Sequence, residues 1–220
     1  MPSGLSEALR EGTRALHTQL EHTGFMQALL RGRVQRAGYC CLLRNLHVVY
    51  LALEAALLRQ SAHPWIAPLP IADLARAGTL EQDLDALHGA DWRRAIAPVP
   101  AAQSYARHLA AIEGEAPGCL LAHVYVRYLG DLNGGQVLRR IVRSSLGLAD
   151  EAGTCFYGFG TAEQAGGLAR GLRSALDGIA LQAGQRELLV REAQRGFALH
   201  APLFEQLQAL GPGSANARAS

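Results

Sequence analysis

The chain has 220 residues, a length that suits one domain. Its net charge is +2, and its 21 basic residues, all of them Arg, are spread along the chain, which argues against the concentrated basic surface of a nucleic-acid-binding protein. The four cysteines include no C-x-x-C pair, so structural zinc and a disulfide framework are not expected and a reduced, cytoplasmic protein is indicated.

Apolar residues recur at helical spacing over nearly the whole chain, and the alternation typical of strands is absent. Ser6 is a candidate N-cap, and Thr79 and Thr161, each followed three residues later by Gln, predict capping boxes. Pro202 is expected to break or bend the last helix. We therefore expect an all-α, single-domain protein. The predicted helices cover residues 6–21, 36–60, 79–89, 100–114, 117–146, 161–177 and 181–210.

The two ends of the chain carry no targeting or anchoring pattern. The N-terminus becomes polar too early for a signal peptide, and no apolar stretch reaches the roughly 18 uncharged residues that a membrane-spanning helix needs. We expect residues 1–210 to form the domain and residues 211–220 to be a disordered tail.

One face of the first predicted helix carries Arg10, Arg14, His17 and Glu21. At about 100° per residue, these four side chains fall within an arc of roughly 60°. Imidazole is a good iron ligand, a carboxylate one turn away can hold its other ring nitrogen, and Arg pairs with ligand carboxylates. A solvated face with ordinary ion pairs explains the same pattern, and on this helix alone it is the commoner explanation.

The helix predicted at residues 117–146 contains Gly130, Gly134 and Gly135. Each glycine costs on the order of 1 kcal/mol relative to Ala, which indicates a bend or a close approach to the backbone. Gly130 and Gly134 share one face, so a flat ligand could lie there, and Asp131 is beside them. Close helix–helix packing through small residues is the alternative.

These segments together resemble the heme oxygenase family. The stretch LLAHVYVRYLGDLNGGQ, residues 120–136, looks like the family signature, and LSEALREGTRALHTQLE, residues 5–21, is similar to its N-terminal proximal helix. VYLALEAAL from Val49, LEQDL from Leu80 and FALHAPLFEQL from Phe197 extend the resemblance to about residue 210. It implies a multi-helix bundle that holds heme between the proximal helix and a glycine-kinked distal helix.

The resemblance also implies roles at matching positions. His17 matches the proximal iron ligand, and Glu21 matches its hydrogen-bonding partner. Gly130 and Gly134 match the distal glycines that lie over the heme. Asp131 matches the distal carboxylate that anchors a water network near bound oxygen.

Further positions complete the implied site, with three departures from the family pattern. Asn133 stands where relatives often have Ser, Val124 stands where a smaller or polar residue is commoner, and Ala169 stands where some relatives carry a Lys that holds a propionate. Arg127 and Tyr50 match members of the distal network, and the positions that match the propionate edge are Arg10, Arg14, Arg173 and Tyr125.

The implied activity is O2-dependent cleavage of heme b, which is both cofactor and substrate, to biliverdin, carbon monoxide and ferrous iron. Arg173 favours opening at the α position. Ferredoxin, flavodoxin or a flavin reductase is the expected electron donor, and a monomer or weak dimer without membrane attachment is expected.

Two alternative functions remain open. A heme storage or transport protein of the same fold is the main alternative, and a non-heme enzyme on a related fold is a more distant one. Asp131 favours the oxygenase, because binding alone needs no distal proton network.

Two further groups of residues have simpler interpretations. Of the seven other histidines, His123 is the best rival for the iron, but it lies about 10 Å along the helix from Gly130 at 1.5 Å per residue. Arg139, Arg140 and Arg143 are expected to form a solvated face, with docking of an acidic electron donor as a minority hypothesis.

Overall fold

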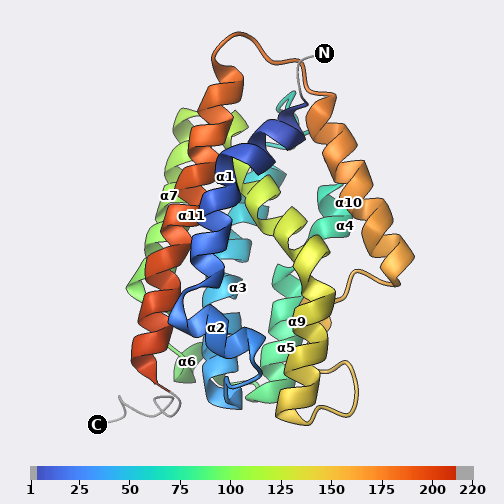
Figure 1. Ribbon diagram of the computed structural model, residues 1–220. Coiled ribbons are helices and arrows are strands. Elements are labelled where there is room, and N and C mark those ends of the chain that lie inside the picture. Colours follow the sequence, from blue (N-terminus) through green and yellow to red (C-terminus); the bar gives the residue numbers. More distant parts are fainter. Residues whose placement is uncertain (1–3, 212–220) are drawn as a thin grey trace.

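The computed structural model describes residues 4–211, and all regular secondary structure in this range is helical (Figure 1). The expected all-α class is confirmed, whereas the expected tail lies, apart from Gly211, outside the described residues. The elements in chain order are α1 (Leu5–Glu21), α2 (Gly24–Leu30), α3 (Arg36–Arg59), α4 (Ile71–Leu74), α5 (Ala77–Leu87), α6 (Trp92–Ala95), α7 (Pro100–Glu115), the 3-10 turn η1 (Pro117–Cys119), α8 (Leu120–Val124), the π-helical turn η2 (Tyr125–Leu129), α9 (Gly130–Leu146), the 3-10 turn η3 (Cys155–Tyr157), α10 (Ala162–Asp177) and α11 (Gln185–Leu210).

The helices pack around one apolar core. Helix α3 lies between α5 and α7, and α11 packs against α1, α7 and α8. Large side chains such as Tyr50, Leu53 and Leu109 are completely buried at these contacts. Burying a Leu-sized side chain contributes roughly 1.5–3 kcal/mol, so the core fixes the relative positions of the helices that surround the cleft described below.

Helix α1 is amphipathic. Leu5, Leu9 and Thr13 are buried, while the face that carries Arg10, Arg14, His17 and Glu21 is exposed. Because α1 lies along α11 (Figure 1), its apolar stripe is covered and its polar stripe is free to meet a ligand.

The predicted helix at residues 117–146 is one continuous path built from four segments. It begins with the 3-10 turn η1, continues as α8, widens into the π-helical turn η2, and returns to α-helix at Gly130. A π-helical turn inserts one extra residue into the hydrogen-bonding pattern and is often found at functional sites. The irregularity thus ends where the glycine-rich stretch begins.

Helix starts differ from two of the sequence predictions. Ser6 is not an N-cap: α1 begins at Leu5 after Gly4, and Ser6 instead donates through N and Oγ to Asp177 of α10 at 2.7 and 2.9 Å. Thr79 forms no capping box, because α5 begins at Ala77 and the first N–H groups donate to Glu54 of α3. A carboxylate from another helix satisfies these donors, and sequence patterns do not report it.

The remaining predictions about helices concern one capping box, Pro202 and the number of helices. The capping box of Thr161 with Gln164 is confirmed, with bonds of 3.2 and 2.7 Å. Helix α11 begins at Gln185 and continues through Pro202, so Pro202 does not break it. The short helices α2, α4 and α6 were not predicted, because they offer too few turns for a periodic pattern.

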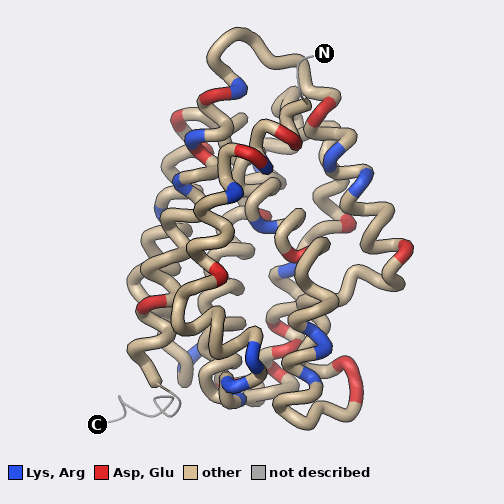
Figure 2. Tube along the Cα trace, in the orientation of Figure 1, with Lys and Arg blue, Asp and Glu red and all other residues tan. Residues whose placement is uncertain are grey.

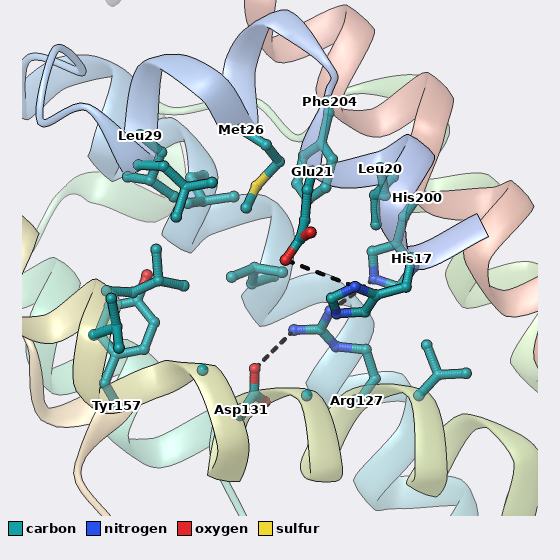
Figure 3. Close-up of a pocket in the computed structure, with 18 of the residues that line it drawn as sticks. His17, Leu20, Glu21, Met26, Leu29, Arg127, Asp131, Tyr157, His200 and Phe204 are labelled. Carbon is teal, nitrogen blue, oxygen red and sulfur yellow. Dashed lines mark hydrogen bonds and ion pairs between the residues drawn. The ribbon is translucent and has the colours of Figure 1, made fainter. Parts of the chain in front are cut away.

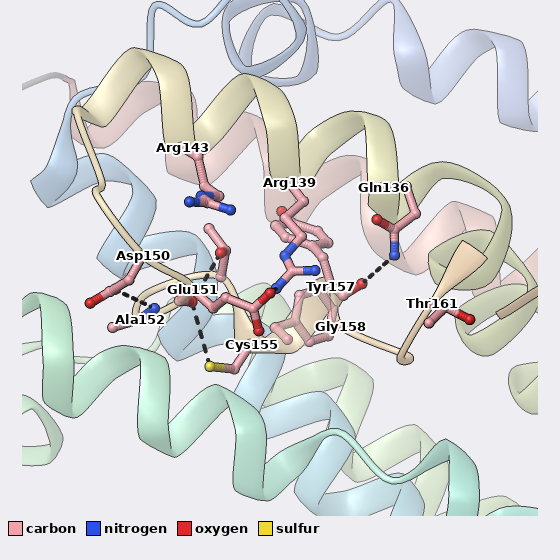
Figure 4. A network of polar contacts seen from close by, with 12 residues as sticks. Gln136, Arg139, Arg143, Asp150, Glu151, Ala152, Cys155, Tyr157, Gly158 and Thr161 are labelled. Carbon is pink, nitrogen blue, oxygen red and sulfur yellow. Dashed lines mark hydrogen bonds and ion pairs between the residues drawn. The ribbon is translucent and has the colours of Figure 1, made fainter. Parts of the chain in front are cut away.

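The connection after α9 is held to that helix by polar contacts (Figure 4). Arg139 pairs with Glu151 at 2.6 Å, and Arg143 donates to the carbonyl of Ala149 at 3.1 Å. The expectation of a solvated face is therefore wrong for Arg139, whose side chain is only 13% exposed.

The turn η3 is held by helix α5. Buried Asp83 of α5 accepts hydrogen bonds from the backbone N–H groups of Cys155 and Phe156 at 2.7 and 2.8 Å, which positions η3 beside the cleft.

Helix α3 is long and apolar enough, by length and composition, to cross a membrane. In the structure 56% of the most apolar 18-residue stretch of this helix is buried, and the helix packs between α5 and α7, as a core helix does.

Acidic and basic residues are interspersed along the helices in Figure 2, in agreement with the small net charge.

Candidate functional site

A cleft separates α1 from the π-helical turn and the first turns of α9. It consists of a cavity of about 340 Å³ and an adjoining cavity of about 500 Å³. The first reaches toward the core and is drawn in Figure 3, and the second opens along the outer edge of α1. Both are lined by His17, Glu21, Val126, Gly130, Gly134 and Phe197.

His17 occupies one wall of this cleft. Its Nδ1 is 3.6 Å from Glu21 Oε1, and its ring contacts the edge of Phe197 with centroids 5.9 Å apart. The side chain is 55% exposed, and Nε2 has no hydrogen-bond partner among residues 4–211. The imidazole therefore has a carboxylate beside one ring nitrogen, while its other nitrogen is free to bind a ligand.

The opposite wall is bare backbone. A Cβ atom added at Gly130 or Gly134 would meet no atom within 4 Å, so both glycines face open space in the cleft. Gly135 differs, because a Cβ there would be 3.5 Å from the ring of Tyr157. The helix-packing explanation thus applies to Gly135, whereas Gly130 and Gly134 leave room for a ligand.

Asp131 belongs to a buried polar network at the inner end of the cleft (Figure 3). It accepts a hydrogen bond from the hydroxyl of Tyr50, and Arg127 Nη2 is 3.4 Å from its Oδ1. Arg127 also donates from Nε to the Tyr50 oxygen at 3.2 Å and from Nη1 to His200 Nε2 at 2.8 Å. Residues from α3, η2, α9 and α11 therefore meet at one guanidinium.

Burial controls the protonation of this network. It raises the pKa of Asp131 well above its usual range, although the guanidinium of Arg127 lies 3.4 Å from its Oδ1. Burial, with Arg127 adding to it, lowers the pKa of His200 to about 3. His200 is thus neutral: its Nδ1–H donates to the carbonyl of Gly196 at 2.8 Å, and its Nε2 accepts from Arg127.

No role was predicted for His200 from the sequence. A signal existed, because Phe197, His200 and Phe204 are spaced by three and four residues and therefore share one face of α11. All three line the cleft. His123, the rival for the iron, does not line it and is completely buried elsewhere.

The outer part of the cleft is the basic part. Arg173 does not line it directly, but donates from Nη2 to Asn133 Oδ1 at 3.0 Å. Burial raises the pKa of Tyr125, whereas a hydrogen bond with Thr13 and the positive charges of Arg10 and Arg173 oppose that rise. Besides His17 and Glu21, the polar residues that line this part are Arg10, Thr13, Arg14, Thr18, Tyr125 and Asn133.

Over the described residues, fold and cleft together define an all-helical protein with one imidazole wall, one glycine wall, a polar inner end and a basic outer edge. Residues 3–206 match the family model described as Heme oxygenase, and the chain belongs to the heme oxygenase family.

Relatives and solved structures agree with this assignment. The chain is 41% identical to "Heme oxygenase" of Porphyra purpurea over 94% of this chain and 88% of the relative, and 37% identical to "Heme oxygenase 1" of Homo sapiens over 96% and 74%. The crystal structure of heme oxygenase-2 from Synechocystis sp. PCC 6803 in complex with heme and NO has a TM-score of 0.91 at 36% identity, covering 94% of this chain and 86% of that one. The heme oxygenase of Leptospira interrogans has a TM-score of 0.87 at 29% identity, covering 93% and 100%.

Proposed function

We propose that this enzyme cleaves heme with molecular oxygen to biliverdin, carbon monoxide and ferrous iron. The observation that carries the proposal is the pairing of two walls: His17 with a free Nε2 on α1, and Gly130 and Gly134 with no atom in front of them on α9. A flat porphyrin would have room between the imidazole of His17 and the bare backbone, whereas a side chain at either glycine would occupy the same space.

The other residues of the cleft fit heme as well. Heme has an apolar body and two propionates at one edge. The inner cavity is mostly apolar, with side chains such as Met26, Leu138 and Phe204, and the basic side chains are at the outer edge. Arg10 and Arg14 would pair with the propionates, Tyr125 would contact the same edge, and Arg173 would reach it beside Asn133.

On the proximal side, His17 would hold the iron of heme b through Nε2. Glu21 would accept a hydrogen bond from Nδ1–H, which selects the tautomer that leaves Nε2 unprotonated and increases its basicity. The bound heme supplies the site for O2 activation and is itself the molecule that is opened, with electrons from an external donor.

On the distal side, Asp131 would hold a proton. Its raised pKa suits a carboxyl group that donates to a water molecule near the iron and is recharged from solvent. Tyr50 and Arg127 would orient this carboxyl group from two directions. The backbone at Gly130 and Gly134 would restrict how O2 can lie over the ring, which is a positioning effect.

Several finer properties belong to the same proposal. We infer that residues 1–210 are the catalytic domain, and that the enzyme works in the cytoplasm as a monomer or weak dimer. We infer that ferredoxin, flavodoxin or a flavin reductase supplies electrons. Arg173 favours biliverdin IXα as the product, because a fixed propionate edge fixes the ring orientation.

A single-turnover experiment tests the proposed activity. Purified protein is mixed with hemin, ascorbate is added in air, and catalase is present to remove free peroxide. Loss of the Soret band with growth of the broad red absorption of biliverdin is the expected result. A stable complex that only becomes reduced or holds oxygen would instead indicate heme storage or transport, and the absence of a heme spectrum would contradict the role of His17.

A further inference from the structure

A second group of metal-ligand side chains lies outside the cleft. His108 of α7, His123 of α8 and Glu192 of α11 converge, and none of them lines either cavity. Their ligand-capable atoms all lie within 4.8 Å of one another. Three helices that are separate in sequence therefore bring two imidazoles and one carboxylate to one point.

The two histidines approach the same carboxylate oxygen. His108 Nε2 is 2.5 Å from Glu192 Oε1, and His123 Nε2 is 2.9 Å from the same atom. One carboxylate oxygen has two lone pairs and can accept both hydrogen bonds. The same convergence brings two imidazole nitrogens and one carboxylate oxygen together, and these are the ligand atoms of many metal sites.

The surroundings orient the ligands and allow entry. The Tyr105 hydroxyl is 2.8 Å from His123 Nδ1, so the second nitrogen of this imidazole is engaged, as it is in most metal-bound histidines. Gly196 makes room for the ring, because a Cβ there would be only 3.3 Å from His123 Nδ1. His123 is fully buried, whereas His108 and Glu192 are 11% and 12% exposed and open the cluster to solvent.

We propose that His108, His123 and Glu192 bind one divalent transition-metal ion of the Zn²⁺ or Fe²⁺ class at a site separate from the heme cleft. Imidazole nitrogen with one carboxylate is the donor set that these ions accept, while Ca²⁺ and Mg²⁺ prefer oxygen ligands throughout. On metal entry each imidazole binds through Nε2, so its single proton moves from Nε2 to Nδ1 by exchange with solvent, and the Tyr105 oxygen turns to accept the hydrogen bond from His123 Nδ1–H. Water would complete the coordination.

Zinc uptake by the full chain tests this site. Protein stripped with a chelator is dialysed against Zn²⁺, and bound zinc is measured by elemental analysis. Two forms are compared: the heme-loaded wild type, in which His17 is occupied, and the heme-free His17→Ala variant, in which His17 is absent. One equivalent of zinc in both forms is expected, so the result does not depend on whether the cleft cleaves heme.

Matched variants assign the zinc to these residues. Glu192→Gln keeps the shape and a hydrogen-bonding oxygen but loses the charge, and His108→Asn removes one ligand at the exposed side. Both are expected to lower zinc affinity at least tenfold. His88→Asn is the control, because His88 also lies beside a carboxylate, Asp91 at 3.4 Å, but outside the cluster. Helical circular dichroism and the Soret band check that each variant is folded.

X-ray absorption of the zinc-loaded wild type gives a readout that needs no variant. Two imidazoles and oxygen ligands at about 2.0–2.2 Å are expected. Absence of saturable zinc uptake, unchanged uptake in Glu192→Gln, or a spectrum without imidazole would show that the three side chains form a hydrogen-bonded cluster only.

Discussion

Arg127 donates a hydrogen bond from Nη1 to Nε2 of His200 at 2.8 Å, and this contact fixes a guanidinium that also touches Tyr50 and Asp131. All of these groups are largely withdrawn from solvent. A buried donor that loses its acceptor costs about 1–3 kcal/mol, so the neutral imidazole of His200 is part of what keeps Arg127 in place.

We therefore expect His200→Leu to destabilise the heme-free protein by about 1–3 kcal/mol, because Arg127 Nη1 would lose its acceptor. His200→Asn offers an amide oxygen and should retain most of the stability. Urea unfolding at neutral pH measures both free energies. Equal stability of the two variants would mean that the hydrogen bond to Arg127 contributes nothing.

The same histidine predicts a pH dependence with a definite sign. The pKa of His200 is about 3 in the folded protein, below about 6.5 for unfolded histidine, so between these values only the unfolded chain takes up this proton. The contribution of His200 to stability is present above about pH 6.5 and is lost progressively as the pH falls toward 3. Urea unfolding of wild type and His200→Asn at pH 7 and pH 5 isolates this effect, and the wild type should lose more stability between the two pH values. If the difference in unfolding free energy between wild type and His200→Asn is the same at pH 7 and pH 5, the lowered pKa of His200 is contradicted.

Substitution at the glycine wall should separate folding from ligand binding. Gly134→Leu introduces a side chain into open space, so it should leave the heme-free protein as stable as before or raise its stability by about 0.5–1 kcal/mol through helix propensity. Heme uptake should fall at least tenfold, because the side chain would fill the cleft. Titration with hemin and urea unfolding measure the two effects.

Gly135→Ala is the control for this prediction, since its Cβ would make only ordinary contact with Tyr157 at 3.5 Å, away from the open face. It should bind heme as the wild type does. Tight heme binding by Gly134→Leu would refute the close-approach interpretation of the glycine wall.

Asp131→Ala should bind heme and fail to open it. Loss of a positioned proton donor typically costs a factor of about 10²–10⁴ in rate, while the proximal contacts of His17 are untouched. Single-turnover biliverdin yield and the Soret band report the two properties separately. A normal yield would exclude Asp131 as the proton donor.

The contact between Arg173 and Asn133 predicts an effect on product identity. Arg173→Ala should broaden the distribution of biliverdin isomers, because the ring could rotate in its plane once a propionate partner is lost. Asn133→Ser, which removes an acceptor of Arg173 but no positive charge, should change the distribution less. Chromatographic separation of the isomers provides the measurement, and a single unchanged isomer in Arg173→Ala would remove Arg173 from the propionate edge.

Much of the fold could be predicted from local patterns. Helical periodicity predicted the long helices, and the capping box at Thr161 marked the start of α10. Interactions from distant residues account for the errors: Asp177 bonds to Ser6, and Glu54 satisfies the start of α5. Short helices such as α2 were not predicted because a helix of seven residues depends on tertiary packing for its stability.

Helical spacing was enough to predict that His17 and Glu21 share one helix face and that Gly130, Asp131 and Gly134 form a glycine-interrupted stretch, because helical geometry converts spacing into direction. Spacing could not predict that the two faces oppose each other across a cleft, that Gly135 packs on Tyr157 while Gly134 does not, or that His200 meets Arg127. These relationships depend on how helices far apart in the chain pack together, and burial, which shifts the pKa values of Asp131 and His200, exists only once they have packed.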